Sequence, residues 1–286
     1  MELTFWHSIV AHDYAIPSGY TVQTMTPELL AYLASPDPEL REEVACTLLS
    51  TWIGRGHYSS AELYVIAQRM IDNLQVGLGE QESETVHLRT FSLLILNEVI
   101  SYDHRYPFLE ESLVRTWLQI VLEYFAAERD LRGYVEGFGW AHAVAHAADS
   151  LMLFARHRYM VGADLERILH AIADKLLTPD EYVYMHVEDE RLAYAVVTAL
   201  RRNLLDQNFL SPWLERLVYR ENRTRWIAQH FTSAVGPAIY ANVRNFLRSL
   251  YFQLVMVDSP PMITPILRMM LLNALKVMDH GFYALS

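Results

Sequence analysis

The sequence predicts an all-α protein built from paired antiparallel helices, an α-solenoid of the HEAT or armadillo type. Apolar residues recur at helical spacing along most of the chain, and glycines and prolines interrupt this pattern at regular intervals. We expect no series of strands. The one alternating stretch, from Tyr182 to Met185, is too short to seed a sheet and lies between predicted helices. We therefore expect one continuous helical-repeat domain over residues 1–286.

The N-terminal part of the chain predicts an irregular segment followed by two helices. Residues 1–25 are rich in aromatic side chains and contain proline and glycine breakers, so no helix is expected there. Thr26 and Pro27 resemble a helix cap followed by proline at the first helical position. After a proline-containing turn, an amphipathic helix is predicted from Glu39 to Trp52.

The remaining helices are bounded by the same turn and capping residues. They are expected at Ser60–Leu74, Glu82–Ile100, Pro107–Phe125, Trp140–Arg156, Ala163–Leu177, Glu188–Leu205, from Ser211 and Pro212 onward, at Ala238–Val257 and at Pro265–Met278. The helix starts recur with a period of about fifty residues and two helices per unit, slightly longer than a HEAT repeat. Stacking such pairs gives a curved array with a concave surface.

The most distinctive stretch of the chain runs from Arg132 to Asp149 and reads RGYVEGFGWAHAVAHAAD. Gly137 and Gly139 precede the predicted helix, so their backbone amides are expected at its N-terminus, where anions bind. Glu136 is expected to serve this helix end or to point into a cleft. The alanines that follow leave room for a close neighbour, either a ligand or another helix.

Two histidines and an acid fall on one stripe of this helix. His142 and His146 are four residues apart and Asp149 is three further on, a spacing that suits three ligands of one divalent metal such as zinc. The pattern lacks the glutamate of the zinc-protease HExxH motif. A structural alternative stays open, in which the histidines hydrogen-bond across a helix interface.

A second polar cluster follows about fifty residues later, at the predicted repeat spacing. It contains His186, Glu188, Asp189 and Arg191, and we expect it to lie near the first cluster. Glu136 or Asp189 is the candidate general base of an enzyme. The candidate ligand-binding residues are Arg132, Tyr134, Trp140, His186, Glu188 and Arg191. Alternatively, the acids at 188–190 stabilise a helix N-terminus while solvated.

Composition excludes several functional classes. The formal net charge of −11 argues against binding to a nucleic-acid backbone, which needs a basic surface. The chain shows neither a membrane-spanning apolar run nor a secretion signal, so a cytoplasmic location is expected. Cys46, the single cysteine, lies in an apolar helical pattern and is predicted to be a core residue.

The segment GYVEGFGWAHAVAHAAD at 133–149, followed by EDERLA at 188–193, resembles a bacterial family catalogued as domain of unknown function 2785. The resemblance covers about Pro36 to Trp213, and the tail beyond resembles nothing we can place. It implies a helical, HEAT-like cytoplasmic protein without an established activity. Its signature positions here would be Arg132, Gly133, Tyr134, Glu136, Gly139, Trp140, His142, His146, Asp149, Asp189 and Arg191.

Three functional hypotheses therefore stay open. In the first, a helical-repeat protein binds a small molecule or peptide on its concave face, around the central stretch. In the second, the protein is a metal-dependent hydrolase with a His/His/Asp site. In the third, it is an interaction scaffold in which these polar residues are structural. The sequence alone does not decide whether the chain is an enzyme, and it predicts no oligomeric state.

Overall fold

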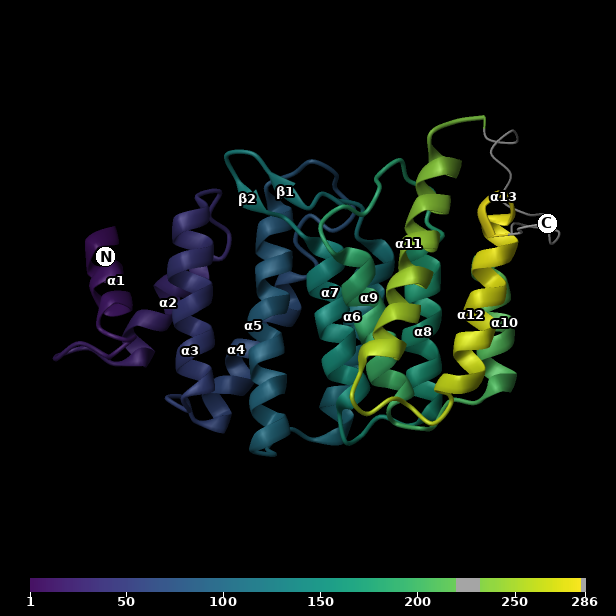
Figure 1. Ribbon diagram of the computed structural model, residues 1–286. Coiled ribbons are helices and arrows are strands. Elements are labelled where there is room, and N and C mark those ends of the chain that lie inside the picture. Colours follow the sequence, from purple (N-terminus) through teal and green to yellow (C-terminus); the bar gives the residue numbers. More distant parts are fainter. Residues whose placement is uncertain (220–231, 284–286) are drawn as a thin grey trace. The chain divides into compact units, whose positions relative to one another are not determined.

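A computed structural model describes residues 1–219 and 232–283 and confirms the all-α class (Figure 1). Its contacts divide the chain into two compact units, unit 1 over Met1–Ser150 and unit 2 over Leu151–Ser286. The boundary falls within helix α7. Among the described helices, none has both the length and the apolar character needed to cross a membrane.

Unit 1 consists of helices and one small hairpin. Its elements are α1 (Leu3–Ala11), α2 (Val22–Tyr32), the π-helix η1 (Glu39–Cys46), α3 (Thr47–Gly54), α4 (Ser60–Asn73), α5 (Thr85–Arg105), α6 (Glu111–Ala127), β1 (Tyr134–Val135), β2 (Gly139–Trp140) and the first half of α7 (Ala143–Arg156). Helix α5 lies at the centre, because α3, α4 and η1 all pack against it. Its exposed surface is accordingly small, and most of its side chains are buried.

The elements of unit 2 in its described part are helices joined by loops. After the end of α7 it contains α8 (Gly162–Leu176), α9 (Glu188–Leu200), α10 (Gln207–Val218), α11 (Val235–Met256), α12 (Thr264–Met278) and the short α13 (His280–Tyr283). Helices α9 and α11 form its most extensive packing, and α12 packs on both α10 and α11. Figure 1 shows α9 beside α11 and α10 beside α12.

Most predicted helices are confirmed, and their boundaries follow from local capping. At α4, the Ser59 hydroxyl accepts a hydrogen bond from the Glu62 amide, while the Glu62 carboxylate accepts one from the Ser59 amide at 2.7 Å. This reciprocal capping box satisfies two backbone donors that a helix start otherwise leaves unpaired. It fixes the start of α4 at the predicted residue.

The N-terminal prediction is wrong, because residues 1–25 contain α1 and the start of α2. Thr21 caps α2 by accepting a hydrogen bond from the Thr24 amide, so Pro27 lies inside the helix rather than at its first position. Pro212 is placed in the same way inside α10, because Asp206 caps that helix further upstream. In both helices a capping side chain, rather than the proline, sets the start.

The predicted helix at Glu39–Trp52 is present in two parts, η1 and α3. Cys46 lies where they meet and is half-buried, at the edge of the core rather than within it as predicted. Desolvation of its thiol raises the pKa to about 12. The widened turns of η1 matter for the site below, because they carry Arg41 and Glu42.

Candidate functional site

The central stretch forms a β-hairpin, which the sequence did not predict. Strands β1 and β2 pair antiparallel, with Tyr134 opposite Trp140 and Val135 opposite Gly139. The Phe138 amide donates to the Val135 carbonyl at 3.0 Å and closes the turn. Helix α7 begins only at Ala143. Gly137 and Gly139 therefore shape the hairpin, and the predicted anion site at a glycine-led helix start is wrong.

Arg41 of η1 contacts the buried side of this hairpin, and its own side chain is fully buried. The guanidinium donates to the Phe138 carbonyl in the hairpin turn, and to the Ser35 carbonyl at 2.7 Å. It also lies 4.9 Å from the centre of the Phe91 ring on α5, in a cation–π arrangement. One buried cation thus joins η1, α5 and the hairpin.

Glu42 completes the attachment of the hairpin to η1. Its Oε1 atom accepts a hydrogen bond from Arg41 at 2.7 Å and another from the Trp140 amide at 3.0 Å. Burial lowers the pKa of Arg41, whereas the adjacent Glu42 carboxylate raises it. The pair therefore forms a charge-assisted clamp on the backbone of the turn, at Phe138, and of β2, at Trp140.

Gly139 is required at the point where this clamp meets the hairpin. Its φ angle is +77°, and a Cβ atom there would lie 2.9 Å or less from Glu42, Arg41 and Pro38. Gly137 has a similar φ of +81°, but an added Cβ would meet no atom within 4 Å. Both positions need a backbone conformation with positive φ, which glycine adopts freely. Only at Gly139 would an added side chain also clash with neighbouring atoms.

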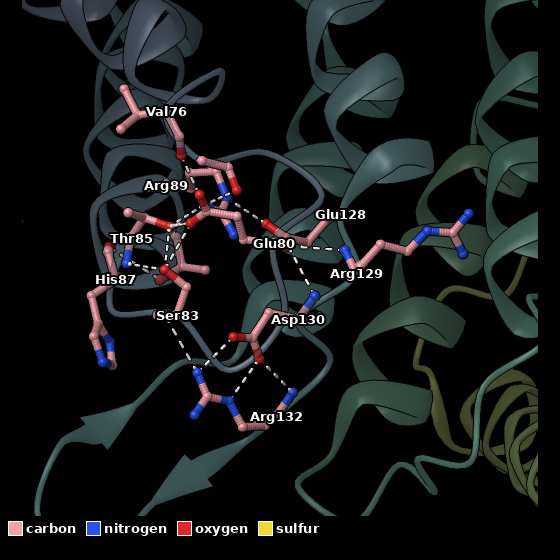
Figure 2. A network of polar contacts seen from close by, with 12 residues as sticks. Val76, Glu80, Ser83, Thr85, His87, Arg89, Glu128, Arg129, Asp130 and Arg132 are labelled. Carbon is pink, nitrogen blue, oxygen red and sulfur yellow. Dashed lines mark hydrogen bonds and ion pairs between the residues drawn. The ribbon is translucent and has the colours of Figure 1, made fainter.

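A second network holds the base of the hairpin (Figure 2). Arg89 on α5 and Glu128 at the end of α6 form a buried ion pair, with Nε and Oε2 2.6 Å apart. Glu128 Oε1 also accepts from the Asp130 amide at 3.0 Å. The Asp130 carboxylate accepts from Arg132 Nε at 2.8 Å, so the segment that enters β1 is fixed to the ends of α5 and α6.

An unbroken series of ring contacts runs from the hairpin surface into the core of unit 1. Tyr134 meets Trp140 edge-on with ring centres 5.2 Å apart, and Trp140 stacks on His142 at 4.6 Å with an interplanar angle of 21°. His142 contacts His146 at 5.5 Å, and His146 contacts Phe91 at 5.7 Å. Since Phe91 also faces Arg41, this aromatic series ends at the buried anchor.

His142 holds the turn between the hairpin and α7. It has a positive φ of 51°, which non-glycine residues rarely adopt and which costs of order 1–3 kcal/mol. Its amide donates to the Arg132 carbonyl at 2.9 Å, and its own carbonyl accepts from the His146 amide at 3.0 Å. These bonds and the stacking on Trp140 hold the strained backbone in place.

His142 and His146 lie in ring contact, and the metal site expected of them with Asp149 stays a prediction. Within residues 1–219 and 232–283, no group of three or more His, Cys, Asp or Glu side chains is arranged to hold a metal ion. Asp149 lies half-buried on α7, whereas Glu136 is exposed at the hairpin turn. The two rings instead join the aromatic series, which fits the structural alternative better than metal ligation.

The second predicted cluster belongs to unit 2 and is attached to α11. Asn242 on that helix accepts from the Tyr184 amide at 2.8 Å and donates to the Tyr182 carbonyl at 3.0 Å. Asp189 accepts from the Ser249 hydroxyl at 2.8 Å. Glu188 is fully buried, which raises its pKa. These contacts give much of the cluster a structural role.

His186 and Arg191 flank this attachment. The Tyr182 hydroxyl lies 3.2 Å from His186 Nδ1, and the His186 amide donates to Glu188 at 2.7 Å. The Arg191 amide donates to the carbonyl of Val187, whose φ is +62°. A left-handed residue thus precedes both α7 and α9. The first cluster belongs to unit 1 and this one to unit 2, so their proximity stays a prediction.

Sequence reasoning missed the residues beneath the hairpin, namely Arg41, Glu42, His87 and Phe91. One signal was available for Arg41, because it lies on the same helical stripe as Ala45, Leu48 and Trp52, all of which are buried. A charged residue on an apolar stripe indicates a buried, paired cation.

The family model described as "protein of unknown function (DUF2785)" matches residues 74–252. This is more than half of the chain. The chain belongs to this family. The match confirms the resemblance seen in the central stretch, but it extends beyond Trp213, where we expected none, and begins after η1. No curated protein and no solved structure gives a significant match.

The Gly139→Ala substitution is expected to lower the free energy of unfolding by about 3 kcal/mol, because it adds a clash with Glu42 and Arg41 to the backbone strain. Gly137→Ala, the matched control, carries only the strain and is expected to cost about 1 kcal/mol. Chemical denaturation followed by circular dichroism measures both values. Equal losses in the two variants would contradict the close approach at Gly139.

His87 gives the site a predicted pH dependence. It is buried beneath the hairpin and hydrogen-bonds the backbone of Trp140; burial, followed by the nearby Arg41 charge, lowers its pKa to about 4. The unfolded chain binds this proton near the ordinary pKa of 6.5, so folding stability falls as the pH drops from about 6.5 to 4, by up to about 3 kcal/mol.

The His87→Gln variant retains an amide donor and cannot titrate in this range. It is expected to lose less stability than the parent between pH 7 and pH 4.5, whatever other groups contribute to both proteins. Denaturant unfolding at the two pH values measures this difference. Identical losses would show that His87 is not the group responsible.

Proposed function

We propose that this protein is a helical-repeat binding protein that takes up a small molecule or peptide at the hairpin surface. We define the hairpin surface by the side chains of Tyr134, Glu136, Phe138 and Trp140. The main support for this proposal is that large aromatic side chains are exposed on a hairpin whose backbone is held in place by Arg41 and Glu42. Tyr134 is 55% exposed and Phe138 is 38% exposed.

Two properties of this surface support a binding role. Exposed aromatic side chains cost free energy in water, and they are the residue types that anchor ligands at binding surfaces. The hairpin is also preorganised, because Arg41, Glu42 and the stacked His142 fix it without a ligand. A preorganised surface loses less conformational entropy when it binds.

The helical-repeat part of the proposal draws on pattern within the chain. Helices α7 and α9 each follow a residue with positive φ, His142 and Val187, 45 positions apart. Each of these residues accepts the first backbone bond of its helix. Similar starts at this separation support a repeated helical unit. The alternative, a metal-dependent hydrolase, needs a metal site, and the described residues include no group of three or more His, Cys, Asp or Glu side chains that could hold the ion.

Ligand-observed NMR with a library of small molecules and short peptides tests this proposal. The test variant is Tyr134→Ala/Phe138→Ala, and the matched control is Tyr64→Ala/Val65→Ala, which removes exposed apolar side chains from α4 in the same unit. We expect a set of ligands whose affinity falls about tenfold or more in the hairpin variant and is unchanged in the control.

Thermal melts check that both variants are folded. We expect that they are, because all four substituted side chains are exposed. If every ligand of the parent protein binds the hairpin variant equally well, the hairpin surface is not the binding site. The same conclusion follows if the parent protein binds no member of the library.

A further inference from the structure

The negative charge of the protein is concentrated in unit 1. Residues 1–150 contain 21 acidic residues against 8 arginines and no lysine, whereas residues 151–286 contain 13 acidic and 15 basic residues. The hairpin surface belongs to the acidic unit. A ligand that approaches this unit therefore meets a field that attracts cations and repels anions.

Acidic side chains flank the hairpin on two sides. Glu42 of η1 bonds the Trp140 amide, and the adjacent Glu43 is exposed. At the base of the hairpin, Arg132 donates to the Ser83 carbonyl at 3.3 Å, which places the loop before α5 against it. That loop carries three exposed acids, Glu80, Glu82 and Glu84.

The arginines that contact the hairpin are already engaged by acids. Arg41 is buried against Glu42. Arg132 lies 2.6 Å from Asp130, which raises the pKa of the guanidinium. The exposed Arg129 is also near the loop, through the Gln81 side chain, but its guanidinium points away from Arg132 and the strands in Figure 2. The local balance at the hairpin surface is therefore negative.

The side chains on the hairpin match the two requirements for binding an organic cation. The exposed ring of Tyr134 carries negative quadrupole charge on its face, which attracts an ammonium or guanidinium group, whereas Trp140 supports this ring and itself stacks on His142. Glu136, exposed in the turn between their strands, supplies a full negative charge. Neither an aromatic face nor a carboxylate alone selects an organic cation. Together on one small hairpin, they favour an organic cation over neutral and anionic ligands.

We infer that the hairpin surface binds a lysine- or arginine-containing peptide segment of a partner protein. The inference rests on the proposed binding function and names its ligand class. A peptide fits better than a small free amine because Tyr134, Glu136 and Phe138 stand out on an open surface. A small amine would bury little area there, whereas a peptide spans the hairpin and reaches the flanking acids.

Fluorescence anisotropy with a short labelled peptide of alternating lysine, arginine and glycine tests this inference. We expect Tyr134→Ala and Glu136→Gln each to weaken binding about threefold to tenfold. The matched controls are Tyr64→Ala and Glu123→Gln, which remove an exposed tyrosine and an exposed acid elsewhere in unit 1. Both controls are expected to bind as the parent protein does.

Three outcomes would overturn the inference. Equal loss in the controls and the hairpin variants would mean diffuse attraction to an acidic unit. Equal binding of a peptide with glutamine in place of lysine and arginine would remove the cation requirement. Full competition by tetramethylammonium or free argininamide, at affinities equal to that of the peptide, would assign the site to a small cation. If only neutral ligands bind the hairpin surface, the proposed function survives without this inference.

Discussion

The buried guanidinium of Arg41 is the interaction on which the candidate site depends. It donates to the hairpin turn, to the loop before η1 and to Glu42, and it faces the ring of Phe91. A buried charge costs several kcal/mol unless its partners satisfy it, so this arrangement is stable only while the hairpin and η1 stay in contact. The hairpin is therefore fixed by an element about a hundred residues earlier in the chain.

The other features of the site follow from this contact. Gly139 lacks a side chain where Glu42 and Arg41 approach, and the positive φ of His142 turns the chain from β2 into α7. The aromatic series then connects the exposed Tyr134 to the buried Phe91. A preorganised binding surface requires a rigid backbone and exposed side chains that can contact a ligand. The hairpin has both, because Arg41 holds its backbone and its aromatic side chains are exposed.

The sequence predicted the helices well because their apolar stripes are long and their caps are local. It missed α1, where an amphipathic turn lies in an aromatic-rich segment, and misplaced Pro27, because the Thr21 cap acts upstream. The hairpin was beyond prediction, since strands of two residues carry no readable alternation. The central stretch was singled out by its composition, and its metal chemistry was inferred from helical spacing alone. The apolar stripe around Arg41 indicates burial, but no local pattern predicts which distant residues Arg41 and His87 contact.

Hydrogen–deuterium exchange on an Arg41→Met variant tests the central claim most directly. The amides of Phe138, Trp140 and Ala141 donate within the structure, to Val135, Glu42 and Gly133 respectively. If Arg41 holds the hairpin, peptides covering 133–142 should lose protection about tenfold or more, while α9 and α11 in unit 2 remain protected. Arg105→Met, an exposed arginine on α5, serves as the control. A hairpin that stays fully protected without Arg41 would contradict the account.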